Sequence, residues 1–309
     1  MKLVSIIILN YNLTDNVRNL LKSINKYTRD INYEVIVVDN NSPDRSIESL
    51  PTEFPQFRFE FLKTNYGFGH GNNVGASLAT GKYLLLLNPD TYLVDNLPLK
   101  LYEFAEKHKD FGIIGPQMQY PDGSFQISYA KFPNIKQEIA KALGIIKLSL
   151  TILHRVKCKV NKEDYFDVDF VFGSCMFIRK EVFESVNGFD EKYFLLSEET
   201  DLCYEVKKYT GSRIIYWRSA KIIHLKSQIT GKDKSGRFKQ EYISKFRFFS
   251  KHYSLIYFLI IRIIIVFIFV FKYLASLIKK GRKGNAKKIY LFIIQLYLNS
   301  SSRTPDSYH

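Results

Sequence analysis

Four short runs of strand-forming residues in the first 90 positions constrain the fold most, because helical or loop segments separate each run from the next. They span 3–9, 34–38, 58–62 and 82–87, and most are rich in Ile, Val and Leu. Such runs are typical of strands that are buried on both faces. Apolar residues at helical spacing predict a helix over 14–27, and a second helix is predicted over 72–79. Strands joined by helical crossovers form a parallel, doubly wound sheet, so the sequence predicts an α/β fold.

Polar side chains follow each of these predicted strands. Ligands of doubly wound sheets bind beyond the carboxyl ends of the strands, where such side chains would gather. One polar group alone is typical of an ordinary turn. Four groups at one edge of the sheet favour a shared binding site. In chain order the residues are Asn10, Tyr11, Asn12, Asp39, Asn40, Asn65, Asn88 and Asp90.

A glycine-rich stretch over 67–75 follows the third predicted strand. Its spacing does not match the dinucleotide-binding fingerprint, and Gly81-Lys82 further on lacks the preceding glycine that a phosphate-binding P-loop needs. Gly67 and Gly71 would allow a ligand to approach the backbone closely. Tight packing of a helix is an equally good interpretation of this segment taken alone.

The second half of the chain adds three carboxylates and a histidine. Glu198, Glu199 and Asp201 stand at the start of a helix predicted over 200–208, and His224 ends a short predicted strand over 221–223. Acidic residues also cap helix N-termini, and a lone histidine is more often an ordinary polar residue than a ligand. A turn over 120–124 predicts a hairpin, and 173–177 predicts a strand that leads into a helix.

Charge separates the C-terminal third from the rest of the chain. Residues 204–309 carry 22 Lys and Arg against 4 Asp and Glu, whereas the first 203 residues carry 23 against 26. A basic excess favours an anionic partner, either nucleic acid or membrane. Here the charges flank an apolar stretch over 255–271, which favours a membrane surface over nucleic acid. Three scattered cysteines without a CxxC pair indicate a reducing compartment.

Residues 255–278 would form a helix of about 36 Å, which is long enough to cross a bilayer. Arg262 and Lys272 would then lie inside the hydrocarbon core, at a cost of about 2.5–3.5 kcal/mol each. We therefore favour a helix in the cytoplasmic interface over a single span, with membrane contact over 255–298. A helix packed on the rest of the protein is the remaining alternative.

Taken in order, these segments resemble the family 2 inverting glycosyltransferases of the GT-A fold, in the rhamnosyltransferase-like bacterial branch. The matching segments are 4–12, 34–42, 65–73, 87–91, 188–191, 198–202 and His224. The resemblance implies a catalytic domain over 1–250, with a nucleotide-sugar half over about 1–115 and an acceptor half over about 116–250. A basic, apolar helical tail would follow over 251–309.

The resemblance also assigns roles to residues. The family's Asp-x-Asp metal motif corresponds to Asn88-Pro89-Asp90, so Asp90 would hold Mg²⁺ or Mn²⁺, with His224 as a second ligand. Glu199 would be the general base where the family usually has aspartate, with Glu198 as the alternative and Asp201 as a supporting carboxylate. The residues implied for binding the nucleotide sugar are Asn10, Tyr11, Asn12, Asp39, Asn40, Asn65, Gly67, Gly71, Asn73 and Asn88.

The implied reaction is a metal-assisted single displacement at the cytoplasmic face of the plasma membrane. The donor would be a nucleotide-diphosphate sugar such as dTDP-rhamnose, and the acceptor a hydroxyl of a glycan or a polyprenyl-lipid-linked precursor. A non-catalytic sugar-nucleotide binder is one alternative, because a single metal carboxylate and the unusual Glu199 depart from the family pattern. A nucleic-acid-binding protein is the other, and the near-neutral first 203 residues argue against it.

Overall fold

The computed structural model describes residues 2–142, 164–225, 234–278 and 284–299. The chain divides into two compact units, the first made of residues 1–132, 160–194 and 198–229 and the second of 133–159, 195–197 and 230–309. The domain boundary predicted after residue 250 falls within α9 (Lys234–His252). This helix belongs to the second unit because its buried side chains pack on α11 (Gly284–Asn299), where the Phe246 and Tyr297 rings lie 5.1 Å apart.

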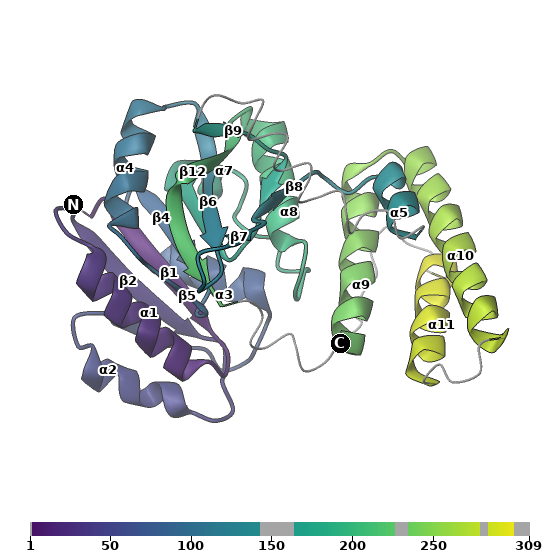
Figure 1. The fold of residues 1–309 in the computed structure, drawn as a ribbon, viewed down its shortest axis with the longest axis horizontal. Coiled ribbons are helices and arrows are strands. Elements are labelled where there is room, and N and C mark those ends of the chain that lie inside the picture. Colours follow the sequence, from purple (N-terminus) through teal and green to yellow (C-terminus); the bar gives the residue numbers. More distant parts are fainter. Residues whose placement is uncertain (1, 143–163, 226–233, 279–283, 300–309) are drawn as a thin grey trace. The chain divides into compact units, whose positions relative to one another are not determined.

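The first unit is built on one ten-stranded mixed sheet (Figure 1). The strands follow the order β3-β2-β1-β4-β11-β6-β12-β5 across the sheet, with β7 paired to β6 and β9 paired to β12. A separate two-stranded sheet pairs β8 (Tyr129–Ala130) with β10 (Phe170–Val171). The ten strands of the main sheet are β1 (Val4–Asn10), β2 (Tyr33–Asp39), β3 (Arg58–Phe61), β4 (Tyr83–Leu87), β5 (Thr91–Tyr92), β6 (Phe111–Gln119), β7 (Phe125–Gln126), β9 (Tyr165–Asp167), β11 (Cys175–Arg179) and β12 (Arg213–His224).

The four predicted N-terminal strands are parallel, as expected from their helical crossovers. The second half of the chain departs from a fully parallel sheet, since β11 inserts between β4 and β6 and runs antiparallel to both. β12 is parallel to β6 and longer than the strand predicted over 221–223. The carboxyl ends of β1, β2, β4, β6 and β12 therefore meet the amino end of β11 along one edge.

Helices cover the sheet, and their buried faces follow the predicted periodicity. The helix predicted over 14–27 is confirmed as α1, in which Val17, Leu20 and Leu21 are fully buried. The hairpin predicted around 120–124 is also confirmed, because β7 pairs antiparallel with β6. The helical segments of this unit are α1 (Thr14–Tyr27), η1 (Ser46–Ser49), α2 (Leu50–Glu53), α3 (Phe68–Leu78), α4 (Leu97–Lys107), α7 (Lys180–Ser185), α8 (Glu198–Glu205) and the π-helical turn η2 (Val206–Thr210).

The glycine-rich stretch allows α3 to lie directly on β1. A methyl group added at Gly71 would lie 2.3 Å from Leu9 Cδ1, and one added at Gly75 would lie 2.5 Å from Ile7 Cγ2. These two glycines are four residues apart, so they face the sheet from successive turns of the helix. Close helix packing accounts for both glycines without a ligand.

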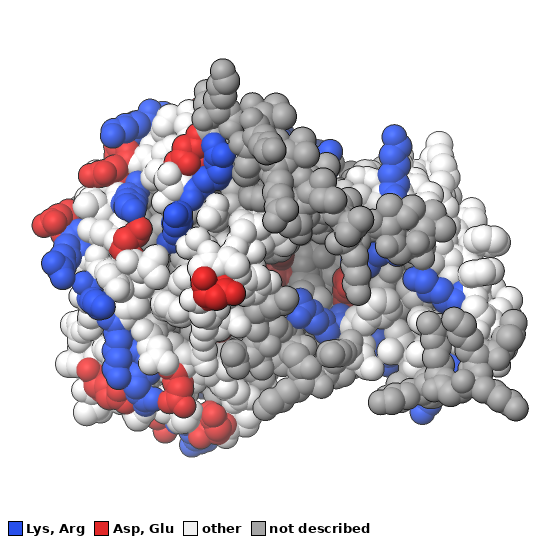
Figure 2. All heavy atoms as spheres, viewed as in Figure 1, with Lys and Arg blue, Asp and Glu red and all other residues white. Residues whose placement is uncertain are grey.

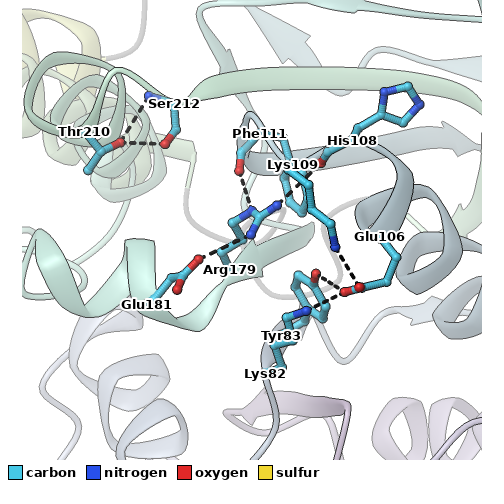
Figure 3. A network of polar contacts seen from close by, with 10 residues as sticks. All are labelled: Lys82, Tyr83, Glu106, His108, Lys109, Phe111, Arg179, Glu181, Thr210 and Ser212. Carbon is cyan, nitrogen blue, oxygen red and sulfur yellow. Dashed lines mark hydrogen bonds and ion pairs between the residues drawn. The ribbon is translucent and has the colours of Figure 1, made fainter.

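A polar network lies at the opposite edge of the sheet, where β4 begins and β11 ends (Figure 3). Arg179 at the end of β11 donates through Nε to the Phe111 carbonyl at 2.8 Å and contacts Glu181 at 3.3 Å. Glu106 on α4 accepts hydrogen bonds from three donors, Lys82 Nζ, Tyr83 Oη and Lys109 Nζ. The network therefore links side chains of β4, α4 and β11 to the backbone of β6.

The second unit is helical in its described part and comprises α5 (Ile135–Ala142), α9, α10 (Leu255–Ile278) and α11. A buried ion pair joins Lys245 on α9 to Glu138 on α5, with an Nζ–Oε1 distance of 2.6 Å. Within Leu255–Leu277 of α10, the most apolar stretch of 18 residues has a mean hydropathy of 2.7, which makes this helix long and apolar enough to cross a membrane.

Candidate active site

Asp39, at the end of β2, is the centre of a hydrogen-bonded group at the carboxyl edge of the sheet. Its Oδ1 accepts from Asn10 Nδ2 at 2.7 Å and from Ser42 Oγ at 2.6 Å, while its Oδ2 accepts from the Ser42 backbone N–H at 2.9 Å. The same Ser42 hydroxyl accepts the backbone N–H of Asn12 at 2.9 Å. Asn10 and Asp39 are both buried, so these bonds hold the first two strand ends rigidly together.

A second group links the ends of β2 and β3 to the start of α3. Asn40 Nδ2 donates to Asn65 Oδ1 at 2.7 Å and to the Gly67 carbonyl at 3.1 Å. Gly67 has a φ of 96°, a left-handed value that favours glycine, and an added methyl group would lie 2.2 Å from the Phe194 carbonyl oxygen. Asn40, Asn65 and Gly67, which the sequence predicts at the binding site, therefore fix the conformation of the loop after β3.

Asp90 and His224 lie side by side, although they come from opposite halves of the chain. The Nε2 of His224 is 3.4 Å from Oδ1 of Asp90, and the backbone N–H of Leu225 donates to the Asp90 carbonyl at 2.8 Å. On its other side, the His224 Nδ1 lies 3.1 Å from Gln126 Oε1. Asp90 is only 6% exposed. A carboxylate oxygen and an imidazole nitrogen in this arrangement are suitable ligands for one divalent cation.

The three carboxylates at the start of α8 differ in their surroundings. Asp201 is fully buried and accepts a hydrogen bond from Tyr193 Oη at 3.0 Å. Glu198 is 4% exposed, and its Oε2 has no hydrogen-bond partner among the described residues. Burial, together with the neighbouring Glu199 carboxylate, raises the pKa of Glu198 well above its usual range. Glu199 is only partly buried.

The position of Glu199 relative to the strand ends follows from Gly173, just before β11. A methyl group added at Gly173 would lie 3.6 Å from Glu199 Cβ. The next residue, Ser174, accepts the backbone N–H of Asn88 at 3.0 Å. The start of α8 thus lies beside the strand end that carries Asn88 and Asp90.

Several predicted site residues have structural partners of their own. Asn73 Nδ2 donates to the Phe189 carbonyl and to Glu191 Oε1, both at 2.9 Å, and Asn73 Oδ1 accepts the Phe189 backbone N–H, so this side chain ties α3 to the segment before α8. Gly71 packs on Leu9, as described above. Tyr11 and Asn12 are at least partly exposed at the end of β1, and Asn12 has a φ of 55°.

Two residues at this edge were assigned no role from the sequence. Ser42 bridges Asp39 and Asn12, and its place in a polar turn after β2 was the available signal. Gln126 contacts His224 from β7, and the only signal for it was that it follows the predicted hairpin turn. A partner across the sheet cannot be read from local periodicity.

Solved structures with the same architecture place the fold among the GT-A glycosyltransferases. A structure of GalNAc-T7 with UDP, GalNAc and Mn²⁺ is similar with a TM-score of 0.55 and 13% identity, over 81% of this chain and 51% of that one. The mannosyltransferase PcManGT from Pyrobaculum calidifontis, in complex with GDP-Man and Mn²⁺, is similar with a TM-score of 0.51 and 14% identity, over 96% of this chain and 70% of that one. At these identities the likeness concerns the fold.

The model of glycosyl transferase family 2 matches residues 5–186, and the chain belongs to this family. It is 26% identical over 236 residues to the N-acetylglucosaminyl-diphospho-decaprenol L-rhamnosyltransferase of Mycobacterium tuberculosis, covering 71% of this chain and 75% of that protein. It is 28% identical over 262 residues to rhamnosyltransferase WbbL of Escherichia coli, covering 81% and 93%. The protein is therefore a glycosyltransferase of a rhamnosyltransferase-like type.

Proposed function

We propose that this glycosyltransferase moves a deoxyhexose, L-rhamnose, from a nucleotide-diphosphate donor to a hydroxyl of a lipid-linked glycan, with inversion at the transferred carbon. The observation that carries the proposal is the pairing of Asp90 with His224 at 3.4 Å, beside Asn88 and the start of α8. The names of the relatives from M. tuberculosis and E. coli support rhamnose as the sugar. The decaprenol diphosphate in the first name supports a lipid-linked acceptor.

Asp90 and His224 would hold a divalent cation, Mg²⁺ or Mn²⁺. The donor set fits, because one buried carboxylate and one imidazole leave most positions of the cation for phosphate oxygens and water. Mn²⁺ in the structures of two GT-A enzymes supports this assignment. When bound, the cation neutralises the negative charge that develops on the diphosphate as it leaves.

On the donor side, we assign the nucleotide to the edge formed by Asn10, Asp39, Asn40 and Asn65. Their side chains are held by one another before any ligand arrives, so little conformational entropy is lost when the donor binds. Asn88 lies next to Asp90, where the diphosphate would pass. The donor is thereby oriented with its sugar toward α8.

Glu199 is the general base of the proposed reaction. The acceptor hydroxyl must lose a proton as it attacks, and a base for this step must be ionised and reachable. Glu198 meets neither condition, because it is buried and its raised pKa favours the neutral form. Glu199, the next residue, is partly exposed and accepts the proton. Its side chain is one methylene longer than that of the aspartate usual in the family. Asp201 supports the helix start through Tyr193.

The proposed place of action is the cytoplasmic face of the plasma membrane, where nucleotide sugars meet the glycan head group of a polyprenyl-linked acceptor. The apolar helix α10 and the surplus of Lys and Arg in the C-terminal third support this placement.

The test is the release of nucleoside diphosphate and the formation of glycosylated product from a panel of sugar nucleotides with a polyprenyl-diphosphate acceptor. We expect turnover with dTDP-rhamnose that depends on Mg²⁺ or Mn²⁺ and on the acceptor. Donor-selective thermal stabilisation without turnover under any of these conditions would instead indicate a non-catalytic sugar-nucleotide binder.

A further inference from the structure

One face of α10 is apolar and exposed from Ile256 to Leu277. In its middle, Ile263 and Phe267 are 69% and 74% exposed. At about 100° per residue, the residues of this face occupy an arc of about 120° around the helix. We call this arc the outer face of α10, and its residues are Ile256, Leu259, Ile260, Ile263, Phe267, Val270, Phe271, Leu274 and Leu277. In Figure 2 the described side chains along the right-hand edge of the helical unit are white, with no Lys, Arg, Asp or Glu coloured among them.

The two charges within α10 do not lie on the outer face. Arg262 donates through Nε to the Tyr297 carbonyl at 2.7 Å and through Nη2 to the Leu298 carbonyl at 3.1 Å, so it caps the C-terminal end of α11. Lys272 is nine positions after Ile263, which places it about 180° around the helix. Its Nζ lies 5.1 Å from the ring of the buried Phe269. The two charges that oppose membrane contact in the sequence therefore point away from the outer face.

The opposite face of α10 is firmly packed in the helical unit. Phe258 and Phe269 are almost fully buried, and their rings lie 5.1 Å from Phe246 and 4.9 Å from Tyr242, respectively, both on α9. Lys245 on α9 is buried in the same unit. Burial alone would lower the pKa of its ammonium group, but the neighbouring carboxylates of Glu138 and Glu241 raise this pKa overall. Moving α10 alone into a bilayer would strip these side chains of their partners.

Charge decides what covers the outer face. Residues 255–299 contain eight Lys and Arg and no Asp or Glu. Two copies of this chain paired through α10 would bring these charges together, because neither α10 nor α11 of the second copy carries an acidic side chain to offset them. The headgroups of an anionic bilayer offset them, while its acyl chains accept the apolar side chains.

We infer that the outer face of α10 is a membrane-docking surface that enters the boundary between headgroups and acyl chains of an anionic bilayer, while the helical unit stays folded on one side. This inference rests on the membrane association proposed above and specifies how it is made. A transmembrane α10 would carry the basic segment 279–288 away from the cytoplasmic catalytic unit, against the usual preference of Lys and Arg for the cytoplasmic side.

The first experiment is flotation of the full-length protein with vesicles of phosphatidylglycerol and phosphatidylethanolamine. The double variant Ile263→Ser with Phe267→Ser should lower the partition coefficient between vesicles and water by about 10²-fold or more, because two large apolar side chains that would enter the bilayer are removed. Tyr209→Ser, which changes a 64% exposed aromatic residue of the other unit, is the matched control and should float as the wild type does. Phosphatidylcholine vesicles should bind the wild type more weakly.

Unchanged flotation of the double variant would overturn the inference. The inference would also be overturned if the wild-type protein bound no vesicles but self-associated, and the double variant abolished this self-association. Both substitutions lie at exposed positions, so circular dichroism should show an unchanged fold.

The second experiment distinguishes docking from spanning. Lys22→Cys on α1 and Lys288→Cys on α11 are exposed positions, and they are made in a Cys158→Ser background because Cys175 and Cys203 are buried. In inside-out membrane vesicles, a membrane-impermeant maleimide should label both new cysteines. Labelling of Lys22→Cys alone, with Lys288→Cys reached only after the vesicles are opened, would show a span and overturn the inference.

Activity separates this inference from the proposed function. Asp90→Asn should float normally, because the catalytic unit does not contribute to docking. A wild-type protein that floats and is labelled as expected but transfers no sugar would refute the proposed function and support the docking surface. A wild-type protein that transfers sugar in solution but does not float with vesicles would support the proposed function and refute the docking surface.

Discussion

The Nε2 of His224 lies 3.4 Å from the Oδ1 of Asp90, and the next residue after the histidine binds the Asp90 carbonyl through its backbone. β12 ends at this histidine, while Asp90 stands in the short turn between β4 and β5. The pairing of β12 with β5 therefore brings together a carboxylate and an imidazole that are far apart in the sequence.

Asp90→Asn should reduce sugar transfer by about 10²-fold or more and leave the melting temperature nearly unchanged. The substitution keeps the size of the side chain and removes the charge that would hold the cation against the leaving diphosphate. Initial rates at saturating Mn²⁺ measure the effect. Asp30→Asn, at an exposed position with a φ of 59°, is the control and should retain full activity. A wild-type rate for Asp90→Asn would remove this residue from the site.

Chelation of divalent cations should abolish turnover, and addition of Mn²⁺ or Mg²⁺ should restore it. His224→Ala should raise the Mn²⁺ concentration for half-maximal rate by about 10-fold or more, because one ligand is lost. Gln126→Ala should produce a smaller shift in the same direction, since Gln126 orients the imidazole through Nδ1. Full activity in the presence of a chelator would contradict a metal-assisted reaction.

The neighbouring Glu198 and Glu199 form a matched pair for mutagenesis. Glu199→Gln should lower kcat by about 10²-fold or more with little change in donor affinity, because it removes the proton acceptor alone. Glu198→Gln should keep most of the activity, since a neutral amide resembles the neutral acid that its raised pKa favours. Glu199→Asp restores the residue usual in the family and should be partly active. The reverse order of the two Gln variants would assign the base to Glu198.

Gly71→Ala should destabilise the protein by about 1–3 kcal/mol, because the added methyl group would lie 2.3 Å from Leu9 Cδ1. Urea denaturation measures the free energy of unfolding. Donor affinity of the remaining folded protein, measured by calorimetry, should be close to the wild-type value. A loss of donor affinity at unchanged stability would mean that Gly71 contacts the nucleotide.

Glu106 should make stability depend on acid pH. Hydrogen bonds from Lys109, Lys82 and Tyr83 lower its pKa from 4.5 to about 2. Between these values the unfolded chain binds more protons than the folded one, so stability present above pH 4.5 is lost as the pH falls toward about 2.

Glu106→Gln tests this by urea denaturation at pH 7 and pH 3. It should lower the free energy of unfolding at pH 7 by about 1 kcal/mol, a modest value because the carboxylate is partly exposed and screened. The difference from wild type should shrink at pH 3. Glu103→Gln, exposed on the same helix, is the control for loss of a surface charge. An undiminished difference at pH 3 would rule out the titration of Glu106 as its cause.

The sequence was sufficient for the features that depend on neighbours in the chain. Apolar runs located β1, β2 and β4, because a strand buried on both faces carries apolar side chains at consecutive positions, and helical spacing located α1, whose buried face repeats with the helical period. The polar residues after these strands could be assigned to one edge, since parallel strands end on the same side. The order of the segments also indicated the family, and the family model matches residues 5–186.

Tertiary structure alone decided the features that join distant segments. The antiparallel insertion of β11 depends on hydrogen bonds to two strands far away in the chain. Glu198 and Glu199 are adjacent and chemically identical, yet packing buries the first and leaves the second partly exposed. In the sequence, Arg262 is a charge within an apolar segment. In the structure, it binds two carbonyl oxygens at the end of α11. Each of these outcomes is set by the desolvation and pairing of groups that only folding brings together, and no local pattern of residues contains that information.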